Sequence, residues 1–221
     1  MMTISENIDK ILESIPENVK LIAVSKTKPK EDIIEAYEGG YKVFGENKPQ
    51  ELKQKHEDLP KDIEWHFIGH LQTNKVKYIA GFVHLIHAVD SLKLLNEINK
   101  QALKHDRVIN CLLQFHIAEE ESKFGYTMQE AQKMLRSEDF QALEGINIVG
   151  VMGMATFTHN EEQVRSEFKL LKNNFETLKS DFFSDKKDFT EISMGMSGDY
   201  QLAIEEGSTM VRVGSSIFGA R

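Results

Sequence analysis

The chain has 221 residues, 40% of them hydrophobic and 28% charged, with a formal net charge of −8. This length and composition predict one soluble domain over residues 1–221, and the net negative charge argues against broad binding to nucleic acid or to anionic membranes. The apolar runs are too short to span a bilayer, and the polar, acidic segment Met1–Lys20 lacks the features of a signal peptide. Cys111 is the only cysteine, which excludes an internal disulfide, so a cytoplasmic protein is expected.

The chain begins with a pattern of apolar residues that predicts an N-terminal helix at about residues 3–14. After this helix, short apolar runs alternate with amphipathic stretches of helical length. Strands are predicted at 20–25, 41–45, 64–69, 83–88, 108–117, 146–154, 189–194 and 210–213. Helices are predicted at 30–39, 48–57, 73–80, 91–104, 127–138, 160–180 and 199–206.

This alternation of strands and helices predicts a parallel (β/α)8 TIM barrel, an α/β fold in a single domain. A doubly wound sheet is the structural alternative, because periodicity does not show whether the sheet closes. Thr127, followed three residues later by Glu130, predicts a capped helix start. The charged segment 180–188 is predicted to form a loop.

Lys26 stands where the first predicted strand meets a loop. In a barrel the carboxyl ends of the strands form the active face. A lysine that is partly desolvated there loses its proton more easily and can form a Schiff base with an aldehyde. The alternative is an ordinary surface lysine beside Lys28 and Lys30, and Lys26 by itself does not decide between the two.

Small polar residues follow the last two predicted strands. Ser197 and Gly198 come after the seventh strand and precede a helix, and Gly214 and Ser215 come after the eighth. Barrels commonly hold phosphate in these two loops, with backbone N–H groups and hydroxyls as donors. Each cluster alone could be an ordinary turn. Barrel closure, however, makes the eighth strand a neighbour of the first, so Lys26 is expected to face this phosphate site.

The other polar residues within predicted strands are weaker candidates. Arg212 lies in an apolar strand, so it should be paired or should face a polar site. His84 and His87 are three residues apart in one predicted strand, which would direct them to opposite faces and make them a poor metal pair. His66 and His70 are expected to be structural, and no metal site is predicted.

Six segments, in order along nearly the whole chain, match one known family. They are Ala23–Pro29, Phe44–Asn47, Trp65–Lys75, Glu120–Gly125, Ser193–Tyr200 and Val211–Gly219. On these segments the chain resembles the pyridoxal 5'-phosphate (PLP) homeostasis proteins, small single-barrel relatives of the alanine racemase N-terminal domain. The resemblance implies a TIM barrel of PLP fold type III that carries or buffers PLP.

The resemblance also implies roles for individual residues. Lys26 would be the Schiff-base (internal aldimine) lysine, and Arg212 would approach the pyridine nitrogen. An arginine there disfavours protonation of that nitrogen and weakens the cofactor as an electron sink, which suits a carrier better than a catalyst. The implied cofactor-binding set is Lys26, Asn47, Met194, Ser197, Gly198, Arg212, Gly214 and Ser215.

Two segments depart from the family pattern. Lys48–Pro49 follows Asn47 where the family usually has an aromatic residue, and Phe115–Ile117 replaces the usual asparagine-rich end of the fifth strand. Neither departure touches the lysine or the phosphate loops. Both departures concern residues expected near the cofactor ring.

The expected function is therefore PLP binding without robust catalytic turnover. Racemases of the related fold take a second base from an additional β-domain, and Arg221 directly follows the last barrel motif here. The first alternative is a PLP-dependent racemase-like enzyme, and the second is a Schiff-base aldolase acting on a sugar phosphate. The expected partners are PLP and apo-enzymes that receive it, and the expected state is a monomer.

Overall fold

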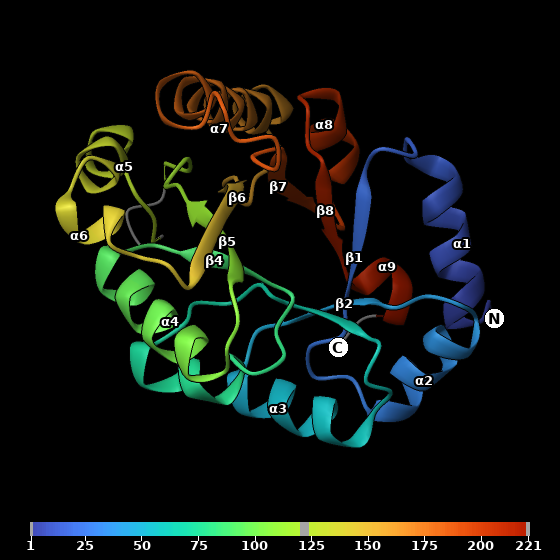
Figure 1. Cartoon of the computed structure of the whole chain (residues 1–221). Coiled ribbons are helices and arrows are strands. Elements are labelled where there is room, and N and C mark those ends of the chain that lie inside the picture. The colour runs from blue at the N-terminus through green and yellow to red at the C-terminus, as the bar shows by residue number, and fades with distance from the viewer. Residues whose placement is uncertain (1, 120–123, 220–221) are drawn as a thin grey trace.

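The strands form a closed parallel barrel in the computed structural model, which describes residues 2–119 and 124–219 (Figure 1). The strands are β1 Lys20–Val24, β2 Val43–Glu46, β3 Glu64–Phe67, β4 Leu85–Val89, β5 Ile109–Gln114, β6 Ile146–Met152, β7 Glu191–Met196 and β8 Met210–Val213. Strand β8 pairs in parallel with β1, with Leu21 opposite Val211. The predicted (β/α)8 barrel is confirmed, and the doubly wound alternative is wrong because the sheet has no open edge among its strands.

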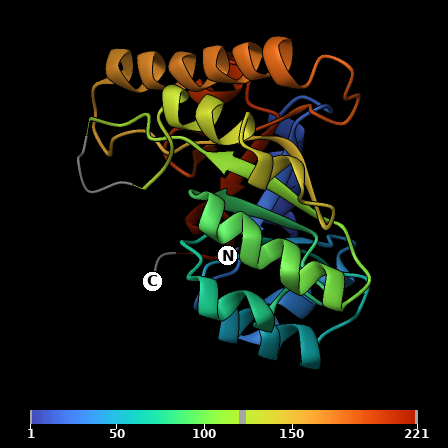
Figure 2. The same ribbon diagram turned by 60° about the vertical axis from the view of Figure 1, so that its left-hand side comes forward.

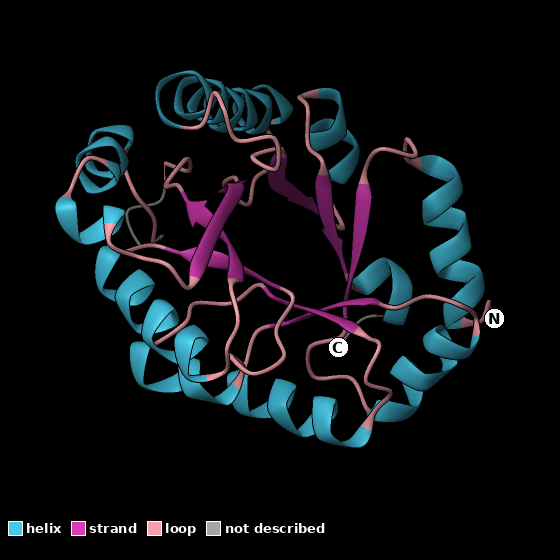
Figure 3. Cartoon of the chain, viewed as in Figure 1, coloured by secondary structure: helices cyan, strands magenta, loops and turns pink. Residues whose placement is uncertain are grey.

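Helices surround the barrel as an outer layer (Figure 3). They are α1 Ile4–Ser14, α2 Lys30–Glu38, α3 Pro49–Asp58, the 3-10 helix η1 Thr73–Tyr78, α4 Leu92–Lys104, α5 Met128–Leu135, α6 Glu138–Gln141, α7 Glu161–Phe182, α8 Tyr200–Glu205 and α9 Ser215–Phe218. Figure 2 shows the long helix α7 lying across one side of the barrel, with α5 beside it. None of the helices described is both long and apolar enough to cross a membrane.

The helical layer differs from the sequence prediction at four places. The helix predicted at 127–138 is divided in two, because the Ser137 hydroxyl accepts a hydrogen bond from the Phe140 N–H and starts α6. The helix predicted at 73–80 is a shorter 3-10 helix. Helix α7 extends into the segment 180–188, where Phe183 stacks on Phe189. The four-residue helix α9 was not predicted.

Helix α1 covers the barrel next to the point of closure. Its Thr3 forms the reciprocal cap with Glu6, and its Ile8 and Ile11 are buried. The side chain of Asn7 donates to the backbone oxygen of Ile217 in α9 at 2.9 Å. The two ends of the described chain are therefore joined beside β1 and β8, and α1 supports the helix that follows β8 (Figure 1).

Two apolar clusters fill the molecule. The larger lies between the strands and the outer helices, and it includes Phe44, Trp65 and Phe67. The smaller is formed by Leu85, Ala88, Leu112, Val149, Met152 and Met210, which come from strands β4, β5, β6 and β8. This second set packs apart from the larger cluster and joins four strands of the ring, which places it inside the barrel. The polar residues that share the interior stand out against this apolar packing.

Candidate functional site

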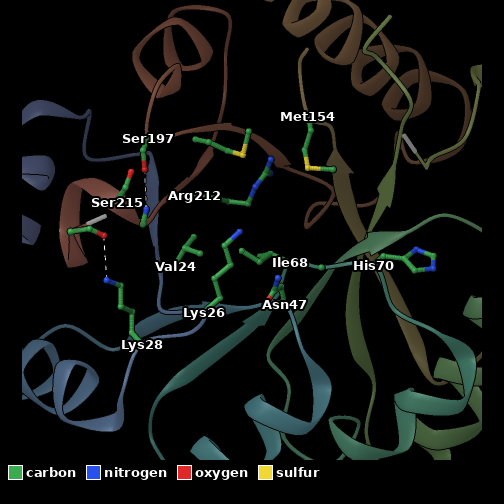
Figure 4. A pocket seen from close by; sticks show the side chains of 14 residues that line it. Val24, Lys26, Lys28, Asn47, Ile68, His70, Met154, Ser197, Arg212 and Ser215 are labelled. Atoms are coloured by element: carbon green, nitrogen blue, oxygen red, sulfur yellow. Dashed lines mark hydrogen bonds between the residues drawn. The ribbon is translucent and has the colours of Figure 1, made fainter. Parts of the chain in front are cut away.

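A cavity of about 440 Å³ opens at the carboxyl ends of the strands (Figure 4). Its lining comes from the last residues of β1, β7 and β8 and from the segments that follow β1, β2, β3, β6, β7 and β8. The lining residues are Val24, Lys26, Lys28, Asn47, Ile68, Gly69, His70, Met154, Met196, Ser197, Arg212, Gly214, Ser215 and Gly219. This is the end of a TIM barrel at which ligands bind.

Lys26 lies two residues after the end of β1, and its side chain extends into the cavity on the side of Arg212 (Figure 4). The next residue, Thr27, has a φ of 65°, a left-handed conformation that is unfavourable for a side chain with a branched Cβ. The Glu51 carboxylate accepts a hydrogen bond from the Thr27 N–H at 2.9 Å and stabilises this turn. The lysine is thus presented from a backbone that its neighbours hold in place.

A buried ionic cluster lies behind Lys26. The Lys55 ammonium donates to the Ser25 carbonyl oxygen at 3.0 Å and to Glu46 and Glu51 at 2.8 Å each. Ser25 donates its hydroxyl proton to the same oxygen of Glu46 at 2.6 Å. Burial raises the pKa of Glu46, against the opposing effect of Lys55. The cluster binds residues on both sides of Lys26, so Lys55 is a positioning residue for it.

The loops after β7 and β8 meet beside Lys26. The Gly214 N–H donates to the Ser197 hydroxyl oxygen at 3.1 Å, which ties the two loops together (Figure 4). Gly214 also comes close to β1, because a Cβ placed on it would lie 3.1 Å from the Val24 oxygen. A Cβ placed on Gly198 would have no heavy atom within 4 Å, so its backbone borders open space. These loops can approach an anion with N–H groups and hydroxyls.

Arg212 forms the base of the cavity and is only 4% exposed. One guanidinium nitrogen donates to the Ser193 hydroxyl at 2.6 Å and to its carbonyl oxygen at 2.9 Å, and the other donates to the Gly153 carbonyl at 3.0 Å. Burial lowers its pKa to about 10, so the guanidinium stays charged at neutral pH. Of the two alternatives expected for Arg212, pairing or facing a polar site, its hydrogen bonds to Ser193 and Gly153 satisfy the first, and it also lines the cavity.

Asn47 follows β2 and lines the cavity opposite the loops that follow β7 and β8. Its Oδ1 is buried and has no hydrogen-bond partner within the described structure. A buried acceptor without a partner is costly, and a ligand that donated a hydrogen bond there would satisfy it.

The structure brings together most of the residues selected from the sequence. Six of them line the cavity, namely Lys26, Asn47, Ser197, Arg212, Gly214 and Ser215. Gly198 lines an adjoining cavity of about 560 Å³ that also contacts Ser197 and Ser215. Met194 is fully buried in the larger apolar cluster and does not line the cavity, which Met196 does instead. Strand β7 is irregular at this point, with a register shift between Ser193 and Met196 and a φ of +91° at Gly195. Met196 therefore does not share the direction of Met194 as it would in a regular strand.

Several lining residues were not selected from the sequence. Ile68, Gly69 and His70 follow β3, and Met154 follows β6, so their position at strand ends was the available signal. Gly219 follows α9, which gave no signal because a four-residue helix has no periodicity. The departures at Lys48–Pro49 and at 115–117 do not line the cavity. Of the matching segment Glu120–Gly125, residues 120–123 lie outside the described part of the chain.

The histidine arrangement differs from its prediction. His84 precedes β4 rather than lying in the strand, so the alternation rule does not separate it from His87. Both rings pack against His66, with centroid distances of 5.3 Å and 5.2 Å. His66 Nδ1 lies 2.9 Å from His87 Nε2, and His87 Nδ1 lies 2.9 Å from the Ser193 hydroxyl. A hydrogen-bonded chain therefore crosses the barrel interior from β3 to Arg212.

Comparison with known proteins places this chain in a family. The model of the alanine racemase N-terminal domain matches residues 1–221. A pyridoxal phosphate homeostasis protein of Aquifex aeolicus is 39% identical over 100% of this chain and 99% of its own length. The human pyridoxal phosphate homeostasis protein is 36% identical over 91% of this chain and 76% of its own length.

Solved structures agree with this assignment. PipY of Synechococcus elongatus PCC7942, solved with PLP bound, has a TM-score of 0.88 at 32% identity and covers 98% of this chain and 100% of its own. Alanine racemase from Bartonella henselae has a TM-score of 0.72 at 15% identity, over 98% of this chain and 58% of its own, and shares the fold alone. The chain belongs to the alanine racemase N-terminal domain family, and within it to the pyridoxal phosphate homeostasis proteins.

Proposed function

We propose that this protein binds pyridoxal 5'-phosphate and carries or buffers it, with Lys26 as the covalent anchor and without robust turnover of its own. The observation that carries the proposal is the convergence of three groups in one cavity. A lysine after β1, a cradle of Ser197, Gly214 and Ser215 after β7 and β8, and a buried arginine all line it. The names of the relatives and the PLP bound in the PipY structure support the same ligand.

The residues present fit this cofactor. The cavity volume lies within the roughly 300–1,000 Å³ usual for small-molecule sites. The buried Oδ1 of Asn47 lacks a donor, and a phenolic hydroxyl on the bound ring would supply one. The space beside Gly198 leaves room for phosphate oxygens near backbone N–H groups.

Each group has a separate task in the proposed carrier. When bound, PLP supplies an aldehyde that a lysine amine can hold covalently. Ser197, Gly214 and Ser215 would hold the phosphate by hydrogen bonds. Arg212 has only N–H donors, so at a pyridine nitrogen it would donate a hydrogen bond and leave that nitrogen without a proton. This arrangement keeps the ring a poor electron sink and favours storage over carbanion chemistry.

The cavity also offers little for proton transfer opposite Lys26. Lys28 donates to the backbone oxygens of Phe218 and Gly219 at 2.8 Å and 3.3 Å. His70 is paired with Asp90 at 3.2 Å and stacked on Phe124, and its ring points away from Lys26 (Figure 4). A racemase needs a second base close to the reacting carbon.

We propose further that the protein acts as a cytoplasmic monomer that delivers PLP to apo-enzymes.

The covalent anchor is tested by borohydride reduction of the PLP-loaded protein followed by peptide mass spectrometry. We expect a single modified lysine at position 26. Lys26→Ala and the charge-preserving Lys26→Arg should both lose the adduct and its visible absorbance, while retaining weaker phosphate-driven binding. Lys28→Ala is the matched control and should keep the adduct. An adduct at another single lysine in Lys26→Ala would show that the anchor is misassigned, and a colourless wild-type protein after PLP loading would favour a sugar-phosphate aldolase.

A racemase-like activity is the competing function, because His70 does line the cavity. Solvent deuterium exchange at the α-carbon of several amino acids separates the two functions. We expect exchange no faster than that catalysed by free PLP. If exchange is fast in the wild type and is lost in both Lys26→Ala and His70→Gln, the protein is a racemase-like enzyme and not a carrier.

A further inference from the structure

A second group of potential ligands lies at the amino-terminal end of the barrel, away from the cavity. Glu64 and His66 are two residues apart on β3, and His84 lies just before β4. One ligand atom from each lies within 4.8 Å of those of the other two. We propose that Glu64, His66 and His84 form a binding site for a divalent transition-metal ion of the Zn²⁺ type, spatially separate from the cavity at the other end of the barrel.

The strongest evidence is an unsatisfied nitrogen on His66. The side chain is fully buried, at 0% exposure, and its Nε2 has no hydrogen-bond partner in the described structure. A buried ring nitrogen without a partner is costly to leave alone, and a neutral imidazole nitrogen is a metal ligand.

The remaining nitrogen of His66 is already oriented for this role. Its Nδ1 lies 2.9 Å from His87 Nε2, and His87 Nδ1 lies 2.9 Å from the Ser193 hydroxyl. With an ion on Nε2, His66 carries its proton on Nδ1 and donates it to His87, which then donates from Nδ1 to Ser193. Metal-binding histidines almost always make such a hydrogen bond, because it holds the ring and the tautomer in place.

The geometry suits a small ion with nitrogen and oxygen ligands. The distance from His84 Nε2 to Glu64 Oε2 is 3.6 Å. Ligand atoms on a tetrahedral Zn²⁺, bound at about 2.0–2.1 Å, lie about 3.4 Å apart, so this pair needs little movement. Two imidazoles and one carboxylate favour Zn²⁺ and its neighbours over Mg²⁺ or Ca²⁺, which prefer oxygen alone. Water would complete the fourth position, since His84 is partly exposed.

One cation competes for this site. Lys20 Nζ lies 3.3 Å from the same Glu64 oxygen, and both side chains are about 40% exposed. Metal binding requires this ammonium to move into solvent, which a flexible, exposed lysine can do. Arg107 adds positive charge near His84. Removing Lys20 should therefore tighten metal binding, whereas a purely structural histidine cluster would show no such effect.

The test is calorimetric titration of ZnCl₂ into the full-length, tag-free, PLP-free protein, with Co²⁺ visible absorption as a report of ligand geometry. We expect one ion per chain at micromolar affinity. His84→Gln and Glu64→Gln should each weaken binding by about tenfold or more. Lys20→Met should tighten it several-fold, and His159→Gln, an exposed histidine elsewhere, should leave it unchanged.

Three outcomes would overturn the site. The first is the absence of stoichiometric Zn²⁺ binding by the wild type at micromolar concentrations. The second is binding that survives both His84→Gln and Glu64→Gln. The third is an affinity that Lys20→Met does not increase. His84 and Glu64 are partly exposed, so these substitutions should leave the barrel folded, which circular dichroism verifies. Because PLP is absent, failure here leaves the proposed carrier function untouched.

Discussion

At the scale of single residues, the site depends on groups that never enter the cavity. Lys26 would be the anchor, yet its position is set by Ser25 and Thr27, which Lys55 and Glu51 bind through hydrogen bonds. Lys55 is 5% exposed and holds two carboxylates and one carbonyl oxygen. Its sequence context, a lysine in a polar helix, gave no indication of this burial.

Lys55→Met should therefore destabilise the protein strongly, because it leaves Glu46 buried without its counter-charge. Removal of one partner from a buried ion pair costs about 3–5 kcal/mol in the free energy of unfolding. Urea denaturation measures this loss, and the reduced yield of borohydride-trapped PLP reports the displaced Lys26. The double variant Glu46→Gln/Lys55→Met should recover part of the stability.

The matched control is Lys53→Met, two positions earlier on the same helix. Lys53 makes only an exposed pair with Glu57 at 3.5 Å, so its loss should change stability by no more than about 0.5 kcal/mol. Equal effects of the two lysine substitutions would show that the buried cluster does not position the site.

At the scale of elements, the carboxyl end of β7 shapes the cradle formed by Ser197, Gly214 and Ser215. Gly195 has a φ of +91°, and a Cβ there would lie 2.6 Å from the Ala203 Cβ and 2.9 Å from the Tyr200 Cα. The glycine thus permits both the turn and the close packing of α8 on β7. This packing places Ser197 within reach of Gly214.

Gly195→Ala should lower the free energy of unfolding by about 1–3 kcal/mol and weaken phosphate or PLP binding. Gly40→Ala is the matched control, because Gly40 has a similar φ of +96° but a Cβ placed on it would have no heavy atom within 4 Å. Gly40→Ala should lower the free energy of unfolding by only about 1 kcal/mol, the cost of placing an alanine in a left-handed backbone conformation. The ligand affinity should not change. Chemical denaturation and PLP titration of both variants give the comparison, and identical results would exclude a packing role for Gly195.

At the scale of the whole molecule, the closed barrel makes every strand contribute to the stability of its neighbours. Every strand has a neighbour on each side, so none can leave without breaking two ladders. The N-terminal helix α1 lies against α2 and α9 and covers the closure between β1 and β8 (Figure 1). Trp65 on β3, the single tryptophan, is fully buried and reports on a distant part of the barrel.

Ile8→Ala in α1 should lower stability by about 2–5 kcal/mol, since Ile8 is 1% exposed. We expect the unfolding midpoints from Trp65 fluorescence and from circular dichroism to fall together, because the barrel unfolds as one unit. Leu12→Ala, at a 38% exposed position of the same helix, should have a much smaller effect. Fluorescence that stays at the wild-type midpoint while circular dichroism shifts would show that α1 unfolds separately.

The sequence by itself determined the order of the elements. Apolar runs such as 210–213 coincide with β8, and the Thr127–Glu130 capping box starts α5 as expected. Lys26, Ser197, Gly214 and Ser215 were selected because their residue types stand at strand ends, where barrels place ligands. The roles of Asn47 and Arg212 came from the resemblance to the family. Local periodicity and turn signals are sufficient for such assignments, since they depend on residues close together in the chain.

Only the tertiary structure decided which side chains meet. Met194 was chosen from a motif, but it is buried in the larger apolar cluster, and the irregular end of β7 at Gly195 presents Met196 to the cavity instead. Lys55 and His66 lie in ordinary sequence, and their partners come from other strands and helices. Barrel closure brings β8 beside β1, and it also joins β3, β4 and β7 through their interior side chains. Such contacts depend on distances across the ring, which no local pattern in the sequence encodes.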